Sequence, residues 1–420
     1  MPKIISIPTD LSRFPTQLIS VSVAAENMPQ AQAAAAQVLS LPKIRITFGD
    51  IHGNAIKLLH ILIMSQVVTK ILSEQYSWLV ELYNTNPSSL TKEDIDCFNA
   101  ILDAMWVSPA VVIISLGDVF ADRGSNDYWT FKILEKLVQA HVSIEILLSN
   151  HDCKLIDFYE HGKLFTFGLL SKNDLFYRSM YNMQILIARE LITPEDVLAM
   201  VEKVYKPLLK ILSYTLDHTK TEITIYSHAP IDLDTIVALA SLFKVNYKDD
   251  TIYDLAKTID LIQQQFAIDV QTNQVYSCKN KNNPVFIDVM HNRVYDLLET
   301  PATAYPVFFI HGHTNKQGEK HPHIRSLNSI FGMPCYEGKG LLELGLGVGE
   351  LQLCELDVSE IECPTEVNSA VASGADAMPA VEADTLSGVR FFGSGPAVEE
   401  QIQPPDATRE KGASGEVKRP

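Results

Sequence analysis

The feature that most constrains the fold is a series of short apolar runs that each end in a polar residue. Five of these runs end at Asp50, Asp118, Asn150, His228 and His311. Helical stretches lie between most of them, and alternating strands and helices are typical of an α/β domain. Ligands of such sheets bind at the carboxyl ends of the strands. The pattern therefore predicts an α/β fold with a polar site at one edge of its sheet.

The same periodicity gives approximate bounds for the elements. Strands are predicted at about residues 43–48, 110–116, 143–148, 222–227, 284–288, 306–311, 324–328, 340–346 and 350–356. Helices are predicted over about 54–83, 91–106 and 178–216. These helices are longer than a simple crossover requires, so they form either a covering layer or a cap over a substrate groove.

Composition divides the chain into three parts. Residues 1–40 are mixed, and 25–40 read as a short helix or a flexible leader. The periodic body, with helical insertions at about 54–106 and 178–216, covers residues 41–356. Residues 357–420 are rich in Ala, Gly, Pro, Ser and Glu, which predicts a disordered acidic tail. Its apolar island at 388–393 is either a short docking motif or an ordinary piece of tail.

The charge and cysteine content exclude several classes of protein. A net charge of −17 and a pI of about 5.1 argue against nucleic acid as a partner. The six cysteines show no CxxC spacing, which predicts free thiols in a reducing compartment. We expect no N-terminal secretion signal and no membrane-spanning segment, because no basic segment leads into an apolar run and no run reaches 18 apolar residues.

The residues at the strand ends predict metal chemistry. They offer carboxylate, amide and imidazole groups without cysteine, a ligand set that suits Mn, Fe or Zn. One carboxylate can bridge two ions, and two ions about 3.5–4 Å apart activate water and clamp a displacement at phosphorus.

Five motifs carry a resemblance to a known family. They are GDIHG (49–53), GDVFADRG (117–124), SNHD (149–152), SHAP (227–230) and GHTN (312–315). In this order they resemble the motifs of the calcineurin-like metallophosphoesterase superfamily, and most closely those of its phosphoprotein phosphatase branch: GDxHG, GDxxDRG, GNHE, H and GH. The resemblance implies an α/β fold in which a β-sandwich is flanked by helices, a four-layer α/β/β/α arrangement.

The resemblance also implies roles for single residues. The first metal would be held by Asp50, His52 and Asp118, and the second by Asp118, Asn150, His228 and His313. A hydroxide between two divalent ions would be the nucleophile. Manganese is the first expectation for these ions, with iron, zinc and magnesium as alternatives.

Three further residues would serve the phosphoryl group and its leaving group. By resemblance, His151 would be the general acid, Asp122 would orient it, and Arg123 would bind phosphate oxygens together with Asn150. Arg293 is either a second phosphate ligand or a surface residue, since its surroundings do not match the family pattern. His311 either supports the site or is a satisfied core histidine.

The chain also departs from the family pattern. Ser149 and Asp152 replace Gly and Glu, and we expect the shorter Asp152 to weaken a structural hydrogen bond. Asn315 stands where many superfamily members have a second metal-binding histidine. The chain has one residue more between Asp118 and Asp122, which predicts a bulge at residues 120–121 that leaves Asp122 within hydrogen-bond reach of His151.

These observations predict a metal-dependent phosphomonoesterase that acts on phosphoproteins carrying phospho-Ser/Thr or phospho-Tyr. One alternative is a hydrolase of dinucleoside polyphosphates or nucleotides, and another is an inactive binding module that keeps the fold. The protein would be cytoplasmic, or exported into a host cell by a signal in its C-terminal tail. The sequence leaves the oligomeric state open.

Overall fold

The computed structural model describes eleven parts of the chain. They are residues 4–7, 44–109, 111–166, 170, 177–217, 219–275, 283–294, 298–314, 321–327, 339–346 and 350–357. The predictions for residues 25–40, for Asn315 and for the tail beyond residue 357 fall outside these residues.

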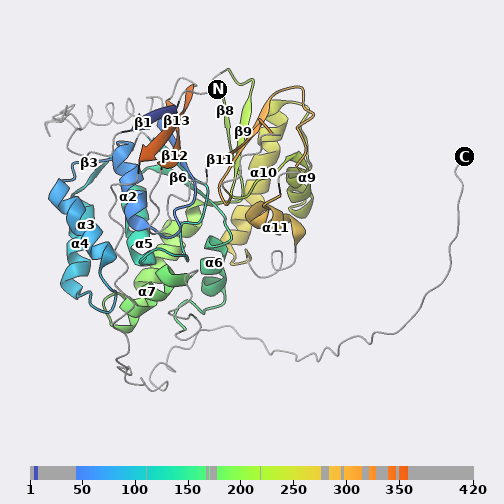
Figure 1. The fold of residues 1–420 in the computed structure, drawn as a ribbon. Helices are drawn as coiled ribbons and strands as arrows, with labels where there is room; N and C mark the ends of the chain where they lie inside the picture. The colour runs from blue at the N-terminus through green and yellow to red at the C-terminus, as the bar shows by residue number, and fades with distance from the viewer. Residues whose placement is uncertain are drawn as a thin grey trace, which may run out of the picture. The chain divides into compact units, whose positions relative to one another are not determined.

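The strands form one large sheet, one smaller sheet and one short ribbon (Figure 1). In order across the seven-stranded sheet they are β1 (Ile4–Ile7), β13 (Glu350–Asp357), β12 (Lys339–Leu346), β2 (Ile44–Phe48), β5 (Val111–Ser115), β6 (Ser143–Leu147) and β7 (Leu209–Lys210). The four-stranded sheet contains β11 (Ile324–Ser326), β10 (Val307–His311), β9 (Ile223–Ser227) and β8 (Ser213–Leu216). The ribbon pairs β3 (Val68–Thr69) with β4 (Trp106–Val107).

Parallel pairing brings the ends of the central strands level with one another. Strands β2, β5 and β6 run parallel, and Phe48 at the end of β2 pairs with Ser115 at the end of β5. Strands β9 and β10 are also parallel, and their final residues Ser227 and His311 pair. The residues that follow these strands therefore leave each sheet at a common edge.

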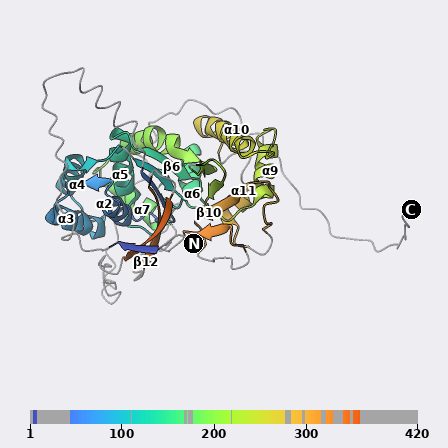
Figure 2. The same cartoon turned by 90° about the horizontal axis from the view of Figure 1, so that it is seen from above.

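The helices fall into two groups (Figures 1 and 2). The group beside the large sheet contains α2 (Ala55–Met64), α3 (Ser73–Asn84), α4 (Lys92–Ala104), α5 (Asp127–Gln139), α6 (Asp152–Glu160), α7 (Arg178–Ala188) and α8 (Pro194–Met200), which continues as π turn η3 (Val201–Tyr205) and 3₁₀ turn η4 (Lys206–Leu208). The group beside the small sheet contains α9 (Leu233–Leu242), α10 (Ile252–Gln271) and α11 (Pro284–His291).

An apolar cluster joins the two sheets. Ile114 of β5 and Leu147 of β6 pack in it with Tyr226 of β9 and Ile310 of β10, and all four are buried. The fold is thus a mixed α/β structure with mainly parallel pairing at its centre, as the alternating pattern predicts.

Three element predictions are wrong in part. Residues 284–288 form the start of α11 rather than a strand, because Pro284 occupies the first turn and the Asn283 side chain accepts the Val285 N–H. The predicted helix 54–83 is interrupted at Gln66, whose left-handed φ of 60° precedes β3. The predicted helix 178–216 ends before residue 209, and the residues that follow form the strands β7 and β8.

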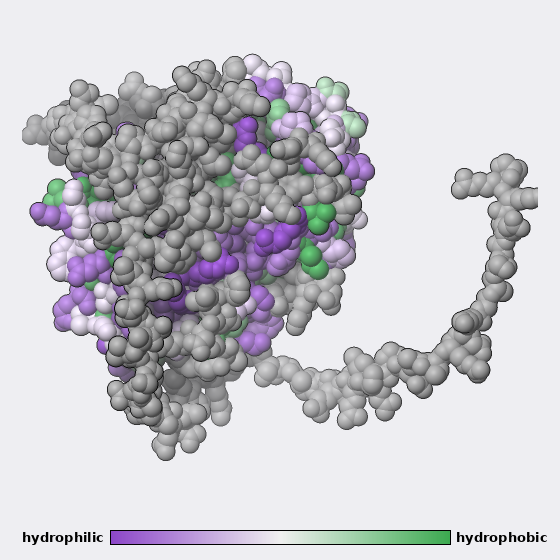
Figure 3. Space-filling view, in the orientation of Figure 1, coloured by the Kyte–Doolittle hydropathy of each residue, from purple (hydrophilic) through white to green (hydrophobic). Residues whose placement is uncertain are grey.

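The surface of the described residues is largely polar on the face seen in Figure 3, where a strongly hydrophilic band crosses the middle of the molecule. None of the helices within the described ranges is both long and apolar enough to cross a membrane.

Candidate active site

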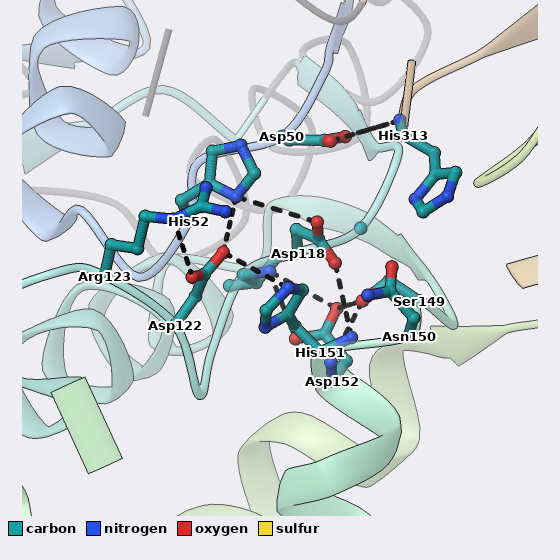
Figure 4. A network of polar contacts seen from close by, with 12 residues as sticks. Asp50, His52, Asp118, Asp122, Arg123, Ser149, Asn150, His151, Asp152 and His313 are labelled. Atoms are coloured by element: carbon teal, nitrogen blue, oxygen red, sulfur yellow. Dashed lines mark hydrogen bonds and ion pairs between the residues drawn. The ribbon is translucent and has the colours of Figure 1, made fainter. Parts of the chain in front are cut away.

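Two groups of side chains meet where the strands end (Figure 4). We call the residues that follow the strands directly the strand-end group: Asp50, His52, Asp118, Asn150, His228 and His313. We call the residues of the second and third motifs beside them the loop group: Asp122, Arg123 and His151.

The backbone of the strand-end group turns sharply. His52, Asp118 and His313 have φ values of 56°, 52° and 58°, in the left-handed region that residues other than glycine rarely adopt. This conformation turns the chain back immediately after the strand, and non-glycine residues in it are concentrated at functional sites.

Asp118 lies at the centre of the strand-end group. Its carboxylate oxygens lie 3.7 Å from His52 Nδ1 and 3.6 Å from His228 Nε2. The backbone N–H of His151 points at Oδ1 from 3.4 Å. One carboxylate thus faces both sides of the site, as a bridging ligand must.

Asp50 connects the end of β2 to the end of β10. Its carboxylate accepts the His313 N–H at 3.1 Å. Gly312 makes this approach possible, because a Cβ at that position would lie 2.3 Å from Asp50 Oδ1.

His228 and Asn150 present electron pairs to each other. His228 Nδ1 lies 2.7 Å from the Leu116 carbonyl, to which it donates, and this bond leaves Nε2 as the unprotonated nitrogen. That nitrogen lies 2.9 Å from Asn150 Oδ1, which is also an acceptor. This pair is satisfied by a cation between the two atoms, by a proton on Nε2, or by the Asn150 amide turned to present its NH₂ group.

The electrostatics of the group also fit a cation. Burial and then the neighbouring Asp118 raise the pKa of Asp50 to about 8. Burial raises the pKa of Asp118 too, but His228, His151 and His52 together hold it below its ordinary value. Burial and then His228 lower the pKa of His313 to about 3, and its buried Nε2 has no hydrogen-bond partner among the described residues.

These donors can hold a metal ion. The ligand atoms of Asp50, His52 and Asp118 lie within 4.8 Å of one another, as do those of Asp118, Asp122 and His151. Carboxylates and imidazoles bind divalent cations in their deprotonated forms. His228 and His313, whose pKa values burial lowers, already favour that form, whereas the carboxylates around His52 outweigh its burial and raise its pKa, so His52 would release a proton when a cation binds.

In the loop group, Asp122 lies between two histidines. Its Oδ2 is 2.5 Å from His52 Nδ1 and 3.6 Å from His151 Nε2, so it hydrogen-bonds His52 and forms an ion pair with His151. Arg123 Nε lies 3.7 Å from Asp122 Oδ1, and the arginine side chain is 25% exposed. Asp122 therefore stays beside His151 despite the added residue in the loop, but at 3.6 Å the two form an ion pair and not the hydrogen bond that we expected.

His151 is held by the loop as well. Its Nδ1 lies 3.1 Å from the Ala121 carbonyl. Burial lowers the pKa of His151, but Asp118, Asp122 and that carbonyl outweigh it and raise the pKa above the ordinary value. The ring is therefore protonated more readily than a free histidine.

The expected weakening at Asp152 is not what the structure has. The buried Asp152 carboxylate accepts the Val119 N–H at 3.1 Å, the Phe120 N–H at 2.9 Å and the Ser149 hydroxyl at 2.9 Å. Burial and then Asp118 raise its pKa to about 7. The shorter acid therefore reaches two amides of the loop, and Ser149 supplies a further donor.

Two residues of undecided role lie near the strand-end group. Arg293 is exposed, and its charge contributes to the lowered pKa of His313. His311 is fully buried and its Nδ1 lies 2.7 Å from the Gly312 carbonyl, which fits a satisfied core histidine.

No sequence motif points to Asp127 and Ser179, which contact the loop at Ala121 and Asp122. The cap of α5 is Asn126, whose side chain accepts the Tyr128 N–H, and Asp127 after it is fully buried. Ser179 stands 57 positions from its partner, outside every motif.

The comparisons with known proteins agree with this site. A family model described as "WipA-like, phosphatase domain" matches residues 112–333. A similar solved structure is the crystal structure of the phosphatase domain from the Legionella effector WipB, at 30% sequence identity and a TM-score of 0.58. The match covers 64% of this chain and 99% of that domain, and no curated protein sequence matches the chain. The resemblance to phosphatases is thereby confirmed, and the chain belongs to the WipA-like phosphatase domain family.

Proposed function

We propose that the protein is a metal-dependent phosphomonoesterase that removes phosphate from phosphoproteins. One observation carries this proposal: the loop group, with an arginine and a histidine whose pKa the neighbouring carboxylates raise, lies directly beside a strand-end group suited to cations. A cation site alone would fit many hydrolases, but a cationic acid and a guanidinium beside it fit transfer of a phosphoryl group.

The strand-end group would hold two divalent ions, manganese first among the candidates. Asp50, His52 and Asp118 would hold one of them. Asn150, His228 and His313 would hold the other, with Asp118 shared. When bound, the ions would supply an activated hydroxide and neutralise charge on the phosphoryl oxygens.

His151 would supply the proton that the leaving alkoxide or phenoxide needs. Its Nδ1 is occupied by the Ala121 carbonyl, so the transferable proton is on Nε2. Asp122 faces that nitrogen from 3.6 Å and would keep the ring cationic until substrate binds. After transfer the neutral ring would recover its proton from water.

Arg123 would bind the phosphate through its fork of donors. Its side chain is mostly buried and Asp122 lies beside its Nε, so the guanidinium is held in one direction. Arg293 and Asn150 would add contacts from the opposite side of the site. The exposed position of Arg293 and its influence on His313 support that arrangement.

The fold around the site would be the four-layer sandwich of the superfamily. The apolar cluster between β5, β6, β9 and β10 supports two packed inner sheets, and the two helix groups support outer layers. The catalytic domain would span residues 41–356 together with β1, which pairs with β13 in the large sheet although it lies within the predicted leader. The tail that follows β13 would lie outside it.

The test is a panel of phosphopeptides with phospho-Ser, phospho-Thr and phospho-Tyr, assayed in Mn, Mg, Zn and Fe in turn. We expect metal-dependent phosphate release from at least one peptide class and none after chelation. A dinucleoside polyphosphate is assayed beside the panel. Turnover of that compound alone would replace the phosphoprotein assignment with the nucleotide hydrolase, and no turnover of any substrate by metal-loaded protein would favour a binding module.

We also propose that the protein is an exported effector, because the similar WipB domain comes from a Legionella effector. A reporter fused to the full chain should enter host cells during infection. A fusion that lacks residues 357–420 should stay in the bacterium, and equal entry of both fusions would remove the tail from the proposal.

A further inference from the structure

Four consecutive backbone N–H groups of the second motif each donate to a buried side chain. Val119 and Phe120 donate to Asp152, as described above. Ala121 donates to Asp127 at 3.1 Å, and Asp122 donates to the Ser179 hydroxyl at 2.9 Å. The whole loop that contains the added residue is therefore fixed through its amides.

Asp127 and Ser179 form a bracket that belongs to none of the five motifs. Asp127 is the first residue of α5 and Ser179 is the second residue of α7, and both are fully buried. The Ser179 N–H donates to the Asp122 carbonyl at 2.8 Å, and its hydroxyl also hydrogen-bonds the Asp127 carboxylate. The two residues thus hold both sides of the peptide that carries Asp122.

The start of α7 continues this support along the loop. Arg178 Nε donates to the Gly124 carbonyl at 3.4 Å, and Asn182 Nδ2 donates to the Ser125 carbonyl at 2.6 Å. The helix predicted as a covering layer or cap therefore makes direct contact with the phosphate-binding motif.

The bracket is packed without spare room. A Cβ at Gly53 would lie 2.9 Å from Ser179 Oγ and 3.4 Å from Asp127 Oδ1. Gly124 touches Gly53 so closely that its own Cβ would lie 1.7 Å from the Gly53 carbonyl oxygen. The bracket is thus wedged against the first motif while it holds the second.

A displacement of the bracket would reach the loop group in two steps. Asp127 fixes the Ala121 amide, and the carbonyl of the same residue contacts His151 Nδ1. Ser179 fixes the next residue, Asp122, which faces His151 Nε2. Within the described part of the chain the bracket has no hydrogen bond or ion pair with Asn150, His228 or His313, and its link to the strand-end group runs through Asp122, which hydrogen-bonds His52 Nδ1.

We propose that Asp127 and Ser179 are positioning residues for proton transfer, which set the geometry of His151 and Asp122 without holding the metal ions. The proposal rests on the proposed function of His151 as the general acid. It assigns a role to α5 and α7 that no motif predicts: they adapt the site to a loop that is one residue longer than the family pattern.

The test compares Ser179→Ala, Asp127→Asn and Asp127→Ala with the wild-type protein on two substrates. A phosphoserine peptide has a poor leaving group that needs a proton, whereas p-nitrophenyl phosphate has a good one that does not. We expect kcat on the peptide to fall roughly 10- to 100-fold in Ser179→Ala and Asp127→Ala, which is the scale of a misplaced catalytic group. We expect kcat on p-nitrophenyl phosphate and the Mn²⁺ affinity measured by calorimetry to change less than about threefold. Positioning affects only the step in which His151 donates a proton to the leaving group, and p-nitrophenolate leaves without that proton.

A matched control separates positioning from stability. Thr258→Ala removes a buried hydroxyl of α10 that hydrogen-bonds the Lys248 backbone and belongs to neither group. It should lower Tm without changing the ratio of the two kcat values. Asp127→Asn keeps an acceptor oxygen and should retain more peptide activity than Asp127→Ala; it also carries the test if the alanine variant does not fold.

Equal losses on both substrates, lost Mn²⁺ affinity, or a lower Tm with wild-type kcat values would each overturn the positioning role. Failure of the proposed function looks different, because the wild-type protein itself would then turn over neither substrate.

Discussion

The strand-end group and the loop group reach the same site by different means. The strand-end residues come directly after strands whose ends are level, so the strand pairing within each of the two sheets brings them to a common edge. The loop group depends on a loop whose backbone amides are held by Asp152, Asp127 and Ser179. The first group is thus fixed by local sequence and sheet pairing, and the second by contacts between distant helices. We expect changes in the first to abolish metal binding and changes in the second to impair turnover.

The largest effect should come from Asp118→Asn. The change removes the charge of the carboxylate that faces both sides of the strand-end group, so both proposed metal sites would lose a ligand. We expect bound metal after dialysis and phosphatase activity to fall to background together. Asp96→Asn, at an exposed position of α4, is the control and should match the wild type. Full metal content in Asp118→Asn would break the distinction between the groups.

A large effect on turnover alone is expected from His151→Ala. Loss of a general acid costs roughly 10²- to 10⁴-fold in kcat. Metal content should remain, because the variant keeps the whole strand-end group. His161→Ala, at the far end of α6, is the control. A near-normal rate on a phosphoserine peptide would remove His151 from the acid role.

A smaller effect should come from Arg123→Ala. A hydrogen bond to a charged group contributes about 1.5–3 kcal/mol, so inhibition by free phosphate should weaken roughly 10- to 100-fold. Arg123→Lys keeps the charge without the fork of donors, so its inhibition constant for free phosphate should lie between those of the wild type and Arg123→Ala. An unchanged inhibition constant in Arg123→Ala would assign phosphate binding to other residues.

The smallest effect on activity should come from a buried histidine outside both groups. Burial and then Lys57 lower the pKa of His60 on α2 to about 4, from 6.5 in an exposed histidine. The unfolded chain therefore takes up this proton first as the pH falls. The contribution of neutral His60 to the free energy of unfolding is fully present above pH 6.5. It is lost as the pH falls from 6.5 to 4, which lowers the free energy of unfolding by about 3 kcal/mol.

Denaturant unfolding of the metal-free protein measures this effect. His60→Leu should show a shallower loss of stability than the wild type between pH 6.5 and 4, with kcat unchanged at neutral pH. His141→Gln, at an exposed position, should keep the wild-type profile. Identical profiles for His60→Leu and the wild type would mean that His60 does not titrate in this range.

The difference between the strand-end group and the loop group also explains which parts of the molecule the sequence predicts. Strands β2, β5, β6, β9 and β10 were predictable because each is an apolar run with a polar end. The segment from Pro284 was not, because a short apolar run fits a strand or a buried helix until its cap is seen. The bracket could not be predicted, because Ser179 has meaning only once α7 packs against a loop 57 positions earlier.

The left-handed backbone at His52, Asp118 and His313 has a consequence for the evolution of this site. Each such residue costs about 1–2 kcal/mol that glycine would not. A library selected only for heat resistance should therefore collect glycines at these three positions and lose its activity. Only selection for chemistry would keep the side chains, so the three positions should distinguish a lineage that still uses its site from one that keeps only the fold.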